Sequence, residues 1–159
     1  MKNQLFINGC WVAPIEGGSF DTIDPSNEVA IAQIAAATKE DVNLAVLAAR
    51  DAFDKSGWPE LSGKDRADYL RRIASLIRDK QQLLAELEVR DNGKPLPEAL
   101  WDIGDTAYCF DFYADLAEKL DDVREKTVGL SDEGFSAVAR KEPVGVCGAI
   151  IPWNFPLLM

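Results

Sequence analysis

Val144-Gly-Val-Cys-Gly-Ala-Ile-Ile151, an unbroken run of apolar residues and glycines, is followed directly by Pro152-Trp-Asn-Phe-Pro156. A short apolar run that is rich in β-branched residues and bounded by turn-forming residues is typical of a strand buried on both faces of a parallel sheet. A parallel neighbour requires a connection of about a dozen residues or more, usually a helix. Because only residues 157–159 follow, we expect the sequence to stop where the core of an α/β domain begins.

The composition restricts the classes of partner. The chain has 159 residues, within the size of one domain, and its 27 acidic and 17 basic residues give a net charge of -10. Such a charge repels nucleic acids and anionic membrane surfaces, so we expect neither as a partner. The sequence contains no signal peptide and no run of the roughly 20 apolar residues that a membrane helix needs. We therefore expect a protein of the cytoplasm or of an organellar stroma.

Histidine and cysteine usage excludes several kinds of catalytic site. The sequence has no histidine, which removes Ser-His-Asp and Cys-His catalysis and HExxH zinc sites. Its three cysteines, Cys10, Cys109 and Cys147, show no CxxC spacing and have apolar neighbours. They indicate a reducing compartment, and we interpret Cys147 as a small core side chain rather than a nucleophile.

The first 35 residues predict two strand pairs. Asn8-Gly9 lies between apolar segments at 5–7 and 10–12, the pattern of a tight β-hairpin whose two turn residues accept positive φ. Residues 20–24 and 29–35 form a second predicted pair, because Pro, Ser and Asn between them favour a turn.

Helices are predicted through the middle of the chain, each with a recognisable end. Thr38 and Asp41, and then Ser62 and Asp65, have the spacing of helix N-terminal capping pairs. Apolar residues repeat at helical spacing over 42–53 and again over 67–77. A third helix over 81–90 should end at the Asp-Asn-Gly-Lys-Pro segment 91–95, where the glycine can adopt a left-handed C-terminal cap.

The longest predicted helix runs from about residue 97 to 120 and should lie along a sheet or another helix. Residues 127–130 and 135–142 then alternate like two exposed strands around a turn at 131–134. We find no internal repeat, no GxGxxG and no P-loop.

The segment from Glu142 to Met159 resembles the NAD(P)-dependent aldehyde dehydrogenase superfamily, most specifically at Pro152–Pro156. Further matching segments follow the order of the family, so the resemblance extends over essentially the whole chain: 5–9, 24–26, 90–95 and 112–117. Within this superfamily the sequence most resembles the betaine-aldehyde and aminoaldehyde branch.

The resemblance implies an α/β fold, which is α+β as truncated. It would be the N-terminal part of an aldehyde dehydrogenase, with hairpins, a helical layer, part of the oligomerisation ribbon and the first Rossmann-type strand. The implied division is 1–126 as the N-terminal part of the cofactor-binding domain, 127–142 as the ribbon and 143–159 as the truncated start of the dinucleotide-binding core. The ribbon would take part in a homo-oligomer.

The same resemblance implies a reaction. In the family a cysteine thiolate attacks a small aldehyde, hydride passes to nicotinamide, and a glutamate-activated water releases the carboxylate. Asn154 matches the asparagine whose side-chain N–H stabilises the oxyanion; the alternative from the residues alone is a turn or helix-capping asparagine. The nucleophilic cysteine and the general-base glutamate would lie beyond residue 159, so we expect no turnover by this chain alone.

Binding residues are also implied. Ile150, Ile151, Pro152 and Trp153 would line the NAD or NADP site, where open α/β sheets bind ligands beyond their strand ends; without the resemblance Trp153 is a core aromatic. Three positions match those that hold a monovalent cation in some members, although a strand end and a helix-terminal aspartate explain them equally well: Thr22, Ile23 and Asp91.

Two other interpretations compete with that of a dehydrogenase fragment. The exposed ribbon and the unpaired apolar strand suit a non-catalytic interaction protein that pairs with full-length dehydrogenase subunits. A free-standing acidic helical domain is the third interpretation, and the Pro152–Pro156 segment speaks against it.

Overall fold

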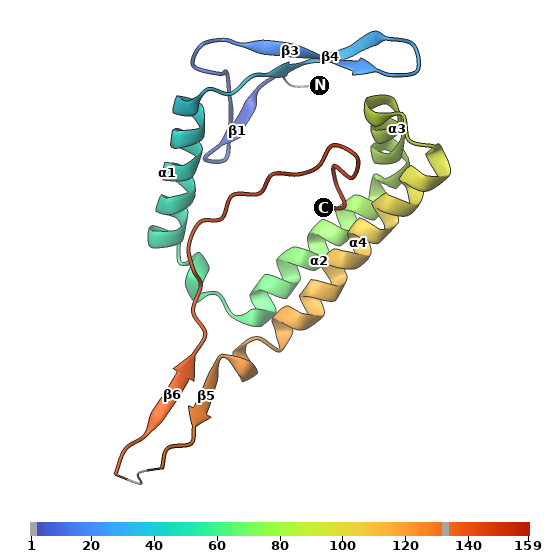
Figure 1. Ribbon diagram of the computed structural model, residues 1–159. Helices are drawn as coiled ribbons and strands as arrows, with labels where there is room; N and C mark the ends of the chain where they lie inside the picture. The colour runs from blue at the N-terminus through green and yellow to red at the C-terminus, as the bar shows by residue number, and fades with distance from the viewer. Residues whose placement is uncertain (1–2, 132–133) are drawn as a thin grey trace.

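The computed structural model describes residues 3–131 and 134–159, in which two strand pairs are followed by helices and then by a third strand pair (Figure 1). Three two-stranded antiparallel sheets are formed within these residues. In chain order the elements are β1 (Leu5–Ile7), β2 (Cys10–Val12), β3 (Ser19–Asp24), β4 (Val29–Ala35), α1 (Lys39–Lys55), the 3₁₀ turn η1 (Trp58–Glu60), α2 (Gly63–Asp79), α3 (Gln81–Asn92), α4 (Leu96–Glu118), η2 (Asp121–Val123), β5 (Glu125–Val128) and β6 (Ala137–Arg140).

Both predicted N-terminal strand pairs are confirmed. Asn8 and Gly9 have φ values of 52° and 75°, the left-handed conformation that a two-residue hairpin turn requires, and Leu5 pairs with Val12 across it. β3 and β4 are antiparallel, with an irregularity in their register between Thr22 and Ile23.

The predicted helix starts are also confirmed. Thr38 caps α1 with its side chain, and the carboxylate of Asp41 accepts the Thr38 N–H at 2.8 Å. Ser62 caps α2 by accepting the Asp65 N–H at 3.1 Å. Each cap satisfies backbone donors that the first turn of a helix leaves unpaired, and this is why the helices begin where the local sequence predicts.

The core lies where α3 and the antiparallel pair α2 and α4 meet (Figure 1). Its fully buried side chains are mostly alanines, which let the helix backbones approach closely. Gln81 ties the start of α3 to α4 by donating to the Leu100 carbonyl at 2.8 Å. Along the outside, Arg71 pairs with Asp115 and Glu118, and Arg78 pairs with Asp111. The predicted packing of the long helix against another helix is confirmed.

Helix α1 buries little of its predicted apolar face. It contacts β1 and η1 but stands apart from the α2–α4 pair (Figure 1). Val42 and Val46 are consequently exposed. The amphipathic spacing is present, but the described residues provide no second layer to cover it.

The predicted buried strand at 144–151 is wrong for this structure. The segment makes no strand pairing, and the exposed fractions of Val144 and Ile150 are 92% and 101%. The physical reason is that a parallel strand is buried only by neighbouring strands, and the described residues supply none. For the same reason Cys147 is exposed, so its interpretation as a core side chain is also wrong. Cys10 and Cys109 are exposed as well.

The ribbon forms, with its first strand shifted from the predicted position. β5 (Glu125–Val128) begins two residues before the predicted strand 127–130, whereas β6 (Ala137–Arg140) lies within the predicted strand 135–142. Two residues of the predicted turn at 131–134, residues 132 and 133, lie outside the described residues.

Candidate functional site

The segment after β6 returns to the corner between α3 and α4 (Figure 1). There the Lys94 ammonium donates a hydrogen bond to the backbone carbonyl of Asn154 at 2.8 Å. The Asn92 side-chain amide donates to the neighbouring carbonyl of Trp153 at 3.5 Å. The Lys94 ammonium also lies 4.3 Å from the centroid of the Phe155 ring, within cation–π range. The predicted catalytic residue is therefore held through its backbone.

The local sequence explains why Lys94 reaches this position. Gly93 ends α3 with φ 78° and donates to the Val89 carbonyl at 2.9 Å, which is the predicted left-handed cap. Asn92 accepts the Lys94 N–H at 3.0 Å and closes a short side-chain turn. A Cβ on Gly93 would lie only 3.0 Å from the Pro25 ring. Glycine at this position therefore allows the left-handed cap and leaves room for Pro25 in the turn between β3 and β4.

Two carboxylates complete the surroundings of Lys94. Its ammonium donates to Glu88 of α3 at 2.6 Å and to Asp102 of α4. The side chains of Glu88 and Lys94 are only 3% and 12% exposed. Burial alone would lower the pKa of Lys94, but hydrogen bonds to Asp102 and Glu88 outweigh it and raise the pKa above its usual value. The lysine is therefore charged at neutral pH, and the cluster joins α3, α4 and the terminal turn.

The side chain of Asn154 is exposed. Within residues 3–131 and 134–159 its amide makes no hydrogen bond, so its donor is free for a ligand. The backbone around it forms a turn, in which Phe155 donates to Pro152 at 3.4 Å and Met159 donates to Phe155 at 3.2 Å. No helix follows within the described residues, so the structure shows a turn asparagine.

The predicted cofactor residues lie in the exposed approach to this turn. Ile150, Ile151, Pro152 and Trp153 are all exposed. The interpretation of Trp153 as a core aromatic is therefore wrong for this structure. The hydrogen bond from Asn92 to the Trp153 carbonyl fixes the end of this run.

The predicted cation residues are partly brought together. The Thr22 hydroxyl donates to the Asp91 carboxylate at 2.7 Å, which joins β3 to the last turn of α3. Ile23 is the next residue of β3, and its side chain is exposed. The described part of the chain contains no cluster of three or more His, Cys, Asp or Glu side chains that could hold a metal ion. A carboxylate and backbone carbonyls are nevertheless ligands that suit a hard cation.

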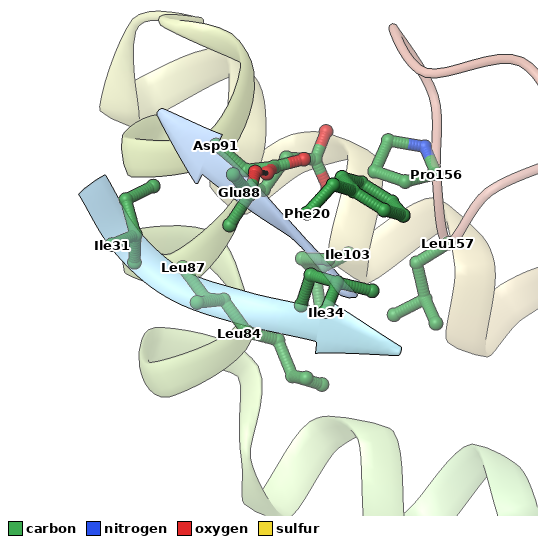
Figure 2. A pocket seen from close by; sticks show the side chains of 11 residues that line it. Phe20, Ile31, Ile34, Leu84, Leu87, Glu88, Asp91, Ile103, Pro156 and Leu157 are labelled. Atoms are coloured by element: carbon green, nitrogen blue, oxygen red, sulfur yellow. Dashed lines mark hydrogen bonds between the residues drawn. The ribbon is translucent and has the colours of Figure 1, made fainter. Parts of the chain in front are cut away.

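A largely apolar cavity of about 480 Å³ lies between the β3–β4 pair and the helices (Figure 2). Pro156 and Leu157 of the terminal turn close one side of it (Figure 2). Its other lining residues come from β3 and β4, from α3 and from α4: Phe20, Thr22, Ile31, Ile34, Leu84, Leu87, Glu88, Asp91 and Ile103. The cavity adjoins both the Thr22–Asp91 pair and the carboxylate that binds Lys94.

Sequence reasoning missed Lys94, Glu88 and Asp102. Lys94 was noted only as part of the segment that ends α3. The spacing Glu-x₅-Lys-x₇-Asp does not predict an ion-pair cluster. The three side chains come together only because the chain reverses direction between α3 and α4. Lysine directly after a capping glycine and before proline was the available clue.

Comparison with known proteins identifies the family. The model of the "Aldehyde dehydrogenase family" matches residues 11–159, so the chain belongs to this family. Betaine aldehyde dehydrogenase 1 of Oryza sativa subsp. japonica is 50% identical over 161 residues, which cover 99% of this chain and 32% of that protein. Peroxisomal aminoaldehyde dehydrogenase 2 of Pisum sativum is 49% identical and has 98% and 32% coverage.

The solved structures that resemble this chain belong to the same family. Betaine aldehyde dehydrogenase of Staphylococcus aureus in complex with NAD+ is 35% identical, with a TM-score of 0.93 over 99% of this chain and 31% of that one. A putative aldehyde dehydrogenase of Burkholderia cenocepacia is 37% identical with a TM-score of 0.90, over 98% of this chain and 32% of that one. The predicted α/β fold, as the N-terminal portion of an aldehyde dehydrogenase, is confirmed. The chain spans about a third of the length of the relatives it matches. Within its described residues no helix is long and apolar enough to cross a membrane.

Proposed function

We propose that this chain forms the N-terminal part of an NAD(P)-dependent aldehyde dehydrogenase that oxidises betaine aldehyde or an aminoaldehyde to a carboxylate through a thiohemiacetal. The observation that carries the proposal is the turn at 152–155, whose backbone is held by Asn92 and Lys94 while the Asn154 amide makes no hydrogen bond to the described residues. The names of the relatives support this substrate class.

Asn154 has the chemistry that the reaction needs. Attack of a thiolate on an aldehyde turns the carbonyl oxygen into an oxyanion, and a fixed N–H donor stabilises that charge. Such a donor contributes about 3 to 4 kcal/mol in comparable sites. Because the backbone of Asn154 is anchored, only rotation about its side-chain bonds is needed to direct the amide toward the oxyanion. The thiolate and the water-activating carboxylate would come from outside these 159 residues.

Ile150, Ile151, Pro152 and Trp153 are the residues that we assign to the cofactor. They precede the anchored turn, at the place where an α/β sheet binds a dinucleotide. The structure of the S. aureus relative holds NAD+, which favours NAD over NADP here. In this assignment the four residues would hold the dinucleotide, and its nicotinamide would supply the hydride acceptor that the oxidation requires.

Thr22, Ile23 and Asp91 are assigned to a monovalent cation. The Thr22–Asp91 hydrogen bond brings two of the three together, and a carboxylate with nearby backbone carbonyls suits a hard ion. The cation would brace β3 against the end of α3.

The division into 1–126, 127–142 and 143–159 remains part of the proposal. It is supported by the ribbon of β5 and β6, which projects away from the helices (Figure 1). An exposed strand edge can pair with a second subunit, so we assign a homo-oligomer to the whole protein. We place it in the cytoplasm or an organellar stroma; curated relatives include peroxisomal and chloroplastic proteins.

The same ribbon supports a second candidate function, namely a non-catalytic protein that pairs with full-length dehydrogenase subunits. Val128 and Val138 are exposed on its two strands. Co-expression with an intact dehydrogenase tests it. A mixed oligomer that a charged Val138→Lys substitution dissolves would favour this function, and separate elution of the two proteins would contradict it.

The main proposal is tested with a chimera in which this chain replaces the matching N-terminal third of rice betaine aldehyde dehydrogenase 1. We expect NADH formation with betaine aldehyde or an aminoaldehyde, and none from the 159-residue chain alone. The intact rice enzyme is the control. A folded chimera that binds NAD but oxidises neither aldehyde would contradict the proposal, as would activity of the chain alone.

A further inference from the structure

We infer that Lys94 is a positioning residue, which fixes the oxyanion-binding amide of Asn154 through the backbone. This inference rests on the proposed function of Asn154 and extends it to a residue outside the resemblance-based site. Its basis is the three-way contact that Lys94 makes with α3, with α4 and with the terminal turn.

All three hydrogens of the Lys94 ammonium have acceptors. Glu88 and Asp102 take two of them, and the carbonyl of Asn154 takes the third. A lysine ammonium has three donors and no acceptor capacity, so this set saturates it. The two carboxylates alone would be enough for Lys94 to link α3 and α4. The third hydrogen bond links the terminal turn to these helices.

Two hydrogen bonds restrain the backbone on both sides of the Asn154 Cα. The Trp153 carbonyl belongs to the peptide plane before the Asn154 Cα, and the Asn154 carbonyl belongs to the plane after it. Asn92 binds the first carbonyl and Lys94 binds the second. With both planes held, the Cα–Cβ bond has one orientation.

Burial makes Lys94 an effective anchor. Its side chain is 12% exposed and Glu88 is 3% exposed, so water screens their charges less than it screens a surface pair. The Phe155 ring covers the ammonium at 4.3 Å. Glu88 and Asp102 belong to α3 and α4, two helices that share the hydrophobic core.

The first test uses hydrogen–deuterium exchange of the 159-residue chain. Lys94→Met should speed exchange in residues 152–159, because the turn loses its anchor, while exchange in α2 stays unchanged. Lys55→Met is the matched control, since Lys55 forms a surface ion pair with Asp51 at 2.9 Å and should leave 152–159 unaffected. Unchanged exchange in 152–159 of the Lys94 variant would overturn the inference.

Lys94→Met leaves two carboxylates unpaired, and these could unfold the protein. A second variant controls for this effect. The triple variant Glu88→Gln, Lys94→Met and Asp102→Asn removes every charge of the cluster at nearly constant volume. It should show the same fast exchange in 152–159 with α2 still protected. Slow exchange there would mean that the charge of Lys94 does not hold the turn.

The catalytic consequence is tested by a double-mutant cycle in the chimera. Lys94→Met should lower kcat by up to about 100-fold, as small misplacements of a catalytic group do, with the KM for NAD unchanged. In the Asn154→Ala background it should cause almost no further loss, because the two residues act through one amide. If the kcat losses of Lys94→Met and Asn154→Ala multiply in the double variant, or if Lys94→Met leaves kcat unchanged, only the role of Lys94 is overturned. An unchanged kcat for Asn154→Ala would overturn the proposed function instead.

Discussion

Asp41 shows how one residue can organise several segments. It is buried at the start of α1, and its carboxylate accepts hydrogen bonds from the N–H and the hydroxyl of Thr38 and from the N–H of Ile15. The backbone hydrogen bond from Thr38 is the main reason why its pKa lies below the usual 3.8, and burial opposes this only in part. Asp41 thus joins the loop after β2 to the first turn of α1.

The lowered pKa predicts a pH dependence of stability. Because the folded-state pKa is below the unfolded one, the contribution of Asp41 is fully present above 3.8 and is lost as the pH falls through the folded-state value. The urea midpoint of the wild type should therefore drop more between about pH 5 and about pH 3 than that of Asp41→Asn. Equal losses in the two proteins would show that Asp41 contributes no such stability.

At the scale of elements, the contact between α2 and α4 depends on one glycine. A Cβ on Gly63 would lie 2.1 Å from the Ala117 carbonyl oxygen at the end of α4. The Gly63 N–H also donates to Asp121 at 2.8 Å, just beyond that helix. The N-terminus of α2 and the C-terminus of α4 can approach this closely only without a side chain.

Gly63→Ala should therefore destabilise the chain by about 1 to 3 kcal/mol, the range for overpacking a tight site. Gly148→Ala is the matched control, because nothing lies within 4 Å of its added methyl group and its effect should stay within about 0.5 kcal/mol. Urea unfolding followed by far-UV circular dichroism measures both. A Gly63→Ala protein as stable as the control would mean that the helices can separate at no cost.

Elements with local signals could be predicted from the sequence. The caps at Thr38 and Ser62 and the left-handed Gly93 depend on residues within one turn, so their positions were predicted correctly. The apolar run 144–151 has a strand sequence but no neighbouring strand among the described residues. Strand formation requires such a partner, and a sequence pattern carries no information on whether the partner is present.

The candidate site was predictable to a lesser degree. Asn154 was found through the family resemblance. Thr22 and Asp91 meet across 69 positions, and only the resemblance suggested that they belong together. Lys94 and its carboxylates could not be found, since their proximity depends on how α3 and α4 pack.

At the scale of the whole molecule, the chain consists of a packed helical part and of segments whose apolar side chains are exposed. α2, α3 and α4 share a core, whereas α1, the ribbon and the segment 144–151 leave apolar side chains exposed. The chain spans about a third of the length of its relatives. Within the proposed function, we assign to this chain the anchored oxyanion-binding amide of Asn154.

That assignment is tested most directly by kcat of the chimera with rice betaine aldehyde dehydrogenase 1 carrying Asn154→Ala. Loss of an oxyanion donor should lower kcat by about 100- to 1000-fold, while the KM for NAD stays the same because the cofactor is bound by other residues. Asn43→Ala, at an exposed position of α1, is the matched control and should keep full kcat. A chimera with Asn154→Ala that is as fast as its parent would contradict the account.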